Sequence, residues 1–169
     1  IVTDRVSSEL AFGLENAGVP PEEIRRRVAE MAGFFGIEGW YHKAIEALSG
    51  GQRQMLNLAS VMVMNPKVLI LDEPTAQLDP IAAADFLAAL ARVNRELGTT
   101  VLLSEQRLEE ALPLSDRAVV LDGGAVLADG APRAVGAQLR TAGHELFRAM
   151  PAAMRVWAAV ENDLPCPVS

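Results

Sequence analysis

The feature that most constrains the fold is a run of four aliphatic residues, Val68 to Leu71, that ends in Asp72 and Glu73. Pro66 precedes the run and Pro74 closes it. Such a run favours a strand that is buried on both faces of a parallel sheet. Ligands of open α/β sheets bind at the carboxyl ends of the strands, where the two carboxylates would lie. The run therefore predicts an α/β fold with an acidic site; the alternative is a strand that meets a solvated turn.

A glycine-rich turn, residues 48–52, lies fifteen residues before this strand. Ser49 is a preferred N-cap residue, and Gly50 and Gly51 leave backbone N–H groups open to close approach. We expect a helix over residues 52–64, rich in Leu, Met, Ala and Val. Free amides and the positive end of the helix dipole make its first turn suitable for an anion. The alternative is an ordinary capped helix without a ligand.

In combination, these elements resemble the motifs of ABC transporter ATP-binding subunits. Residues 48–52 resemble the signature motif, and residues 68–72 resemble the Walker B strand. Glu73 stands where the family has its catalytic glutamate, and Ala76-Gln77-Leu78-Asp79 resembles the D-loop. The four elements follow the family's order and spacing. The resemblance implies a partial P-loop NTPase core of the ABC ATPase type, with a mainly parallel sheet and an α-helical subdomain.

The resemblance also implies ATP hydrolysis with ATP and Mg²⁺ as cofactors. Asp72 would hold Mg²⁺ through a water molecule, and Glu73 would polarise the attacking water as general base. In this family each ATP lies between the P-loop of one subunit and the signature of the other, so a second ATPase half or subunit is an expected partner. Residues expected to bind the nucleotide at that interface are Leu48, Ser49, Gly50, Gly51, Gln52 and Asp79.

The sequence departs from the family pattern in lacking a P-loop. Lys43 and Lys67 follow His42 and Pro66, so Gly-Lys-Ser/Thr occurs nowhere. The Q-loop glutamine is absent as well, and Ile1 is not an initiator Met. We therefore expect a fragment that covers about the last two thirds of a cassette. It should bind ATP weakly or not at all, be inactive alone, and self-associate through exposed sheet edges and an apolar face.

A second departure is Gln106, which occupies the place of the family's switch histidine. Glutamine donates hydrogen bonds to a phosphate oxygen, but it carries neither a mobile proton nor a positive charge. We expect Gln106 to contribute to catalysis and to leave this half-site slow.

Three segments are expected. Residues 1–48 form the helical subdomain, residues 49–143 form the carboxyl-terminal part of the ATPase core, and residues 144–169 form a helical extension or linker. Core elements expected between residues 81 and 143 are a helix over 81–97, a strand over 99–103, a helix from Leu108, a hairpin of 118–121 with 125–128, and a helix over 132–139. Residues 1–4 and 9–16 resemble energy-coupling factor ATPases. Residues 151–154 and 165–168 resemble the connection between tandem ATPase halves; the alternative is a simple C-terminal tail.

Composition limits the function classes. The net charge is −7 and no basic stripe is present, which disfavours nucleic acid as a partner. Cys166 is the single cysteine, so neither an internal disulfide nor a cysteine metal cluster forms. No run of eighteen apolar residues is present, so no segment is expected to span a membrane. The family resemblance implies a peripheral protein at the cytoplasmic face of the membrane.

These features favour one functional interpretation, in which the chain is part of an ATPase that energises import of a metal ion or vitamin through a transmembrane subunit. Two alternatives stay open. One is an ABC ATPase outside transport, and the other is a degenerate regulatory cassette that only dimerises. The sequence does not indicate the solute, because ABC ATPases do not contact it.

Overall fold

The computed structural model describes residues 1–160 and 165–168, and it divides into two compact units. The first unit comprises residues 1–104 and the second comprises residues 105–169. The segment boundaries expected after residues 48 and 143 stay predictions.

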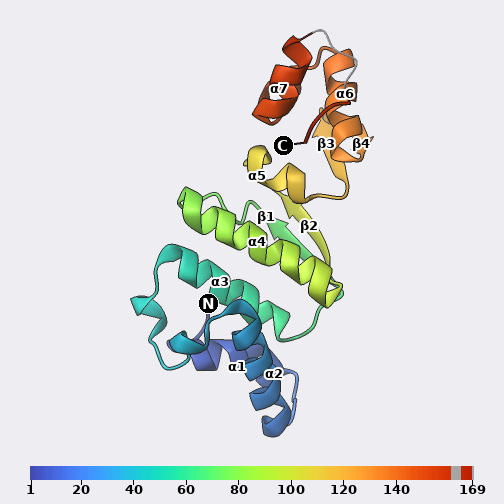
Figure 1. Cartoon of the computed structure of the whole chain (residues 1–169). Coiled ribbons are helices and arrows are strands. Elements are labelled where there is room, and N and C mark those ends of the chain that lie inside the picture. The colour runs from blue at the N-terminus through green and yellow to red at the C-terminus, as the bar shows by residue number, and fades with distance from the viewer. Residues whose placement is uncertain (161–164, 169) are drawn as a thin grey trace. The chain divides into compact units, whose positions relative to one another are not determined.

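The first unit begins with a three-helix cluster, in which α1 (Val6–Asn16) packs against α2 (Pro21–Phe35) and α3 (Gly50–Met62) (Figure 1). Two short 3₁₀ helices, η1 (Glu38–Trp40) and η2 (Ile45–Ala47), connect α2 to α3. The positions spaced four apart in α1 are buried, as their periodicity predicts. The core consists of Val6, Leu10, Leu14, Val28, Ala32, Ile37, Ile45, Leu48, Leu56, Ala59 and Val63.

The rest of the first unit is a strand–helix–strand element. Strand β1 (Val68–Asp72) pairs in parallel with β2 (Thr100–Ser104), and α4 (Pro80–Leu97) connects them (Figure 1). Gly98 directly follows the last residue of α4, and its φ of 68° is the left-handed conformation that glycine favours. The buried face of α4 packs with α3 over β1. This core consists of Leu58, Met62, Leu69, Phe86, Leu87, Ala89, Leu90 and Val93.

The expectation that the first strand is buried on both faces is wrong for the described residues. Leu69 is 5% exposed, whereas Val68 and Ile70 are 56% and 70% exposed. Leu102 of β2 is 60% exposed on the neighbouring strand. Helices α3 and α4 cover only the Leu69 face, because side chains along a strand alternate between the two faces. The other face is the exposed apolar face that the sequence predicts, and self-association through it stays a prediction.

Glu9 is a buried acid of α1 that holds the chain's first residues. Its side chain is 6% exposed, and Oε2 accepts hydrogen bonds from Val2 N (2.9 Å), Thr3 N (2.8 Å) and Thr3 Oγ1 (3.0 Å). Burial by itself raises the pKa of the Glu9 carboxyl, but these hydrogen bonds outweigh burial and place the pKa below its ordinary value. The ionised form is therefore the one that the fold stabilises.

Replacing Glu9 by Gln is expected to destabilise the first unit by about 1–2 kcal/mol at neutral pH, because one acceptor facing the two amides becomes a donor. The folded pKa lies below the unfolded one, so the carboxylate's contribution is present above about pH 4.3 and is lost as the pH falls through the folded value. Denaturant unfolding of both proteins at several pH values measures this. The exposed Glu15 of the same helix supplies the control variant Glu15→Gln. A Glu9→Gln effect that is the same at all pH values would contradict the assignment.

The second unit contains α5 (Leu108–Ala111), η3 (Leu112–Leu114), an antiparallel hairpin and three further helical elements. Gly123 and Gly124 form the two-residue hairpin turn, with φ values of 54° and 79°. Positive φ at both positions matches the twist of the strands, which confirms the predicted hairpin. The remaining elements are β3 (Ala118–Asp122), β4 (Ala125–Gly130), α6 (Pro132–Thr141), η4 (Glu145–Ala149) and α7 (Ala152–Ala159).

The core of the second unit includes the chain's single cysteine. Cys166 is 5% exposed and free, and its Sγ lies near α6 and Met154. Its role in the structure is therefore packing. The core consists of Leu112, Ala128, Val135, Leu139, Met150, Met154 and Cys166. Within residues 1–160 and 165–168, no helix is long and apolar enough to cross a membrane.

Candidate functional site

The start of α3 is fixed by a reciprocal cap. Ser49 Oγ accepts a hydrogen bond from Gln52 N (3.2 Å), and Gln52 Oε1 accepts one from Ser49 N (3.0 Å). This capping box starts the helix at Gly50, two residues before the predicted start. Leu48 is 4% exposed and packs in the helical core. Two of the predicted nucleotide-binding side chains, those of Leu48 and Gln52, thus have structural roles of their own.

The two glycines that follow the cap have different surroundings. A Cβ built on Gly50 would meet nothing within 4 Å, whereas one on Gly51 would lie 2.7 Å from Ala82 Cβ on α4. Gly51 therefore permits the close approach of α3 to α4. Gly50 is exposed and lies in the first turn, where backbone N–H groups lack intrahelical acceptors. An anion such as a phosphate fits this turn.

The acidic pair lies at the carboxyl end of β1, as the sequence predicts. Asp72 is the last residue of β1 and pairs in register with Ser104, the last residue of β2. Glu73 follows with its N–H donating to Ser104 O (2.9 Å). Both acids are exposed. A single exposed carboxylate suits Mg²⁺, which proteins bind through one or two carboxylates together with the phosphates of a substrate.

Glu73 has a strained backbone, with a φ of 44°. The left-handed region costs a non-glycine residue about 1–2 kcal/mol. Such strain persists where the surrounding structure enforces it, and it concentrates at functional positions. The Glu73 N–H bond to β2 and the bond from Ala76 N to Glu73 O (3.2 Å) are two contacts that hold this conformation. The structure thus directs the chain away from the strand at the residue predicted to be the general base.

Asp79 has a structural role that the sequence analysis missed. Its Oδ1 accepts hydrogen bonds from Ile81 N and Ala82 N, both 3.0 Å, so Asp79 is the N-cap of α4. The signal was present in the sequence, because Asp followed by Pro80 is a typical helix start. The cap also places Ala82 where it meets Gly51.

A second residue that the sequence analysis missed is Gln54, whose Nε2 donates to Pro74 O (3.1 Å). This bond joins α3 to the residue directly after Glu73. Its partner is twenty residues away, so no local pattern in the sequence predicts it.

Gln106 lies in the second unit and is exposed. Its predicted role as a donor to a phosphate oxygen of the nucleotide stays a prediction. No group of three or more His, Cys, Asp or Glu side chains within the described ranges could hold a metal ion by itself. Within the first unit, the α3 start approaches the α4 start at Gly51 and Ala82, and Gln54 of α3 contacts Pro74, which follows Glu73.

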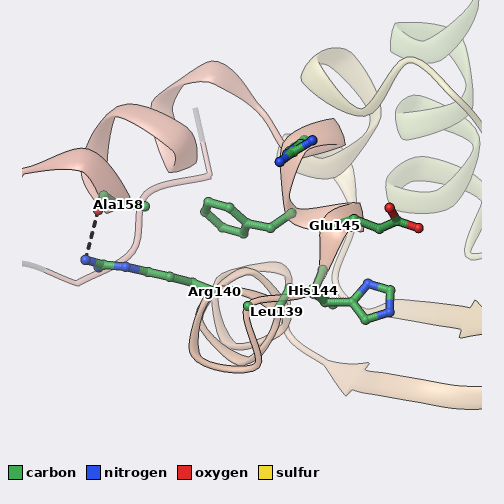
Figure 2. Close-up of a pocket in the computed structure, with 8 residues that line it drawn as sticks. Leu139, Arg140, His144, Glu145 and Ala158 are labelled. Carbon is green, nitrogen blue, oxygen red and sulfur yellow. Dashed lines mark hydrogen bonds between the residues drawn. The ribbon is translucent and has the colours of Figure 1, made fainter.

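The second unit has a hollow beside α6 and η4, shown in Figure 2. Arg140 Nη2 donates to Ala158 O (2.9 Å), and its guanidinium lies 4.4 Å from the centroid of the Trp157 ring. His144 Nδ1 accepts from Leu146 N (3.3 Å), and Nε2 lies 3.3 Å from Asp122 Oδ2. Arg140 and His144 thus make contacts within the second unit.

Parallel strands joined by a helix, with acids at the strand end, define an α/β fold whose ligands bind at the carboxyl ends of the strands. Residues 3–76 match the family described as ABC transporter. Over these residues the chain therefore belongs to the ABC transporter family.

Similar proteins agree with this assignment. A Bacillus anthracis protein named as an ABC transporter ATP-binding protein is 51% identical over 139 residues, which cover 82% of this chain and 25% of that protein. The energy-coupling factor transporter ATP-binding protein EcfA1 of Caldanaerobacter subterraneus is 42% identical over 137 residues, 80% of this chain and 48% of the relative. The chain thus spans between a quarter and a half of these relatives.

A solved structure shares the fold. The cbiO1 protein of Clostridium perfringens, described as part of the ABC transporter complex cbiONQ, is 34% identical with a TM-score of 0.76. The similarity covers 88% of this chain and 60% of that protein.

Proposed function

We propose that this chain supplies the signature, Walker B and D-loop part of an ATPase that energises import of a small solute, a metal ion or a vitamin. The observation that carries the proposal is one compact unit with a capped, glycine-rich α3 start and an acidic pair at the end of β1. The similarity to EcfA1 and to cbiO1 supports the narrower assignment to import.

Each residue has a separate task in this mechanism. When bound, Mg²⁺ would neutralise charge on the phosphates of ATP. Asp72 would hold the metal through water, and Glu73 would accept a proton from the attacking water. The amides of Gly50 and Gly51 donate to the γ-phosphate of a nucleotide held by a second ATPase subunit. Asp79 caps α4, and α4 in turn packs against the start of α3, so Asp79 keeps the α3 start in place.

The partners in this proposal are a second ATPase half and a transmembrane subunit, with the ATPase peripheral at the cytoplasmic face of the membrane. The test is a complete cassette containing this chain, reconstituted with its transmembrane subunit in vesicles. ATP-dependent uptake of a metal ion or vitamin is expected. Stable assembly with ATP-dependent export would overturn the import assignment, and absence of any ATP hydrolysis would overturn the ATPase assignment.

Gln106 favours a second candidate, a regulatory cassette that turns over slowly. If Gln106 contacts the γ-phosphate, replacing it by His restores a charge-assisted hydrogen bond worth about 2 kcal/mol, or some tens-fold in rate. We expect Gln106→His to raise kcat of the complete cassette accordingly, measured as phosphate release. No rise in kcat would show that Gln106 does not limit turnover.

A further inference from the structure

Gln54 links α3 to the loop that follows the acidic pair. It lies on α3, one turn after the Gly50 and Gly51 amides, and its side chain is half-buried. Its Nε2 donates to Pro74 O at 3.1 Å. Proline has no backbone N–H, so this carbonyl oxygen is the only hydrogen-bonding group of Pro74, the residue that follows Glu73.

The loop that receives this bond is short and tightly turned. Leu78 N donates to Thr75 O (3.0 Å), which makes a turn between the acidic pair and the α4 cap. Pro74 is buried, and Thr75 is fully buried with an Oγ1 that has no hydrogen-bond partner among the described residues. Pro74 is bonded directly to Glu73, whose φ of 44° is uncommon for a non-glycine residue, so a displacement of Pro74 is expected to move Glu73.

We propose that Gln54 is a positioning residue that couples the α3 start to the general base within one chain. The inference rests on the proposed ATPase function. There, the first turn of α3 contacts the nucleotide of the partner subunit, while Glu73 acts on the nucleotide of its own subunit. Through the Gln54–Pro74 hydrogen bond, the position of the first turn of α3 determines the position of Glu73. Glu73 is therefore aligned when the first turn of α3 binds the ATP of the partner subunit.

The contact itself is tested in this chain, independently of ATPase activity. Gln54→Met keeps side-chain length and helix propensity but removes the donor. Backbone amide exchange of residues 76 and 78 is expected to be about tenfold faster in the variant, since both amides close turns of the loop that Pro74 begins. The matched control is Ser60→Ala, whose hydroxyl on the same helix donates only to Asn57 O of α3 itself (2.9 Å). Equal exchange in the two variants would overturn the proposed role of the contact.

The coupling is tested by kinetics of a complete cassette that contains this chain. Gln54→Met is expected to lower kcat about fivefold to tenfold, the effect of one hydrogen bond, with KM for ATP within about twofold of wild type. A purely structural role would instead lower the melting temperature and the amount of active protein. If the wild-type cassette hydrolyses no ATP, the proposed function fails. If it does and Gln54→Met matches Ser60→Ala in kcat, the coupling alone is wrong.

Discussion

Glu73→Gln in a complete cassette is expected to lower kcat for ATP hydrolysis by about a hundredfold or more, because the amide cannot accept the proton of the attacking water. Glutamine has nearly the same shape, so the backbone at φ 44° and the bond to Ser104 O are retained. The melting temperature and ATP affinity are therefore expected to stay close to wild type. Phosphate release and nucleotide binding on the same preparations measure the two properties separately.

The control for this experiment is Glu46→Gln, which removes an exposed acid on η2 of the same unit. It is expected to leave kcat unchanged. Hydrolysis by Glu73→Gln at the wild-type rate would show that another group accepts the proton, and the role given to the acidic pair would fail.

Gly51→Ala is expected to destabilise the first unit by about 1–3 kcal/mol, because the added methyl group would lie 2.7 Å from Ala82 Cβ and must push α3 away from α4. The matched variant is Gly50→Ala, which adds the same methyl group where nothing lies within 4 Å. It is expected to change stability by less than about 0.5 kcal/mol. Urea unfolding of this chain measures the difference.

The double variant Gly51→Ala with Ala82→Gly supplies a stricter test. Removing the Ala82 methyl group restores the space for the methyl group at position 51, so much of the lost stability is expected to return. The glycine within α4 itself lowers the stability by about 1 kcal/mol. Equal stability of Gly50→Ala and Gly51→Ala would contradict the close packing. In a complete cassette, Gly50→Ala is also expected to impair ATP turnover, since it narrows the approach to the first-turn amides.

Much of the first unit follows from local patterns. Ser49 with Gln52 three residues later is a capping box, and the helix begins beside it. The inward positions of α4 and the left-handed Gly98 after its last turn agree with the sequence. These features are predictable because each depends on residues within one or two helical turns. The burial of β1 was not predictable from its sequence, because burial depends on which elements cover each face of the sheet.

The sequence by itself determined the chemistry of this protein, namely a glycine-rich helix start, a strand that ends in Asp72 and Glu73, and a family resemblance that follows from them. Only the tertiary structure decided that Gly51 makes room for Ala82 and that Gln54 holds Pro74. The physical reason is the separation in sequence of the residues that interact. Caps and periodicities act along the chain, whereas the Gly51 and Gln54 contacts join residues at least twenty positions apart, brought together only when α3 and α4 pack over one face of the sheet.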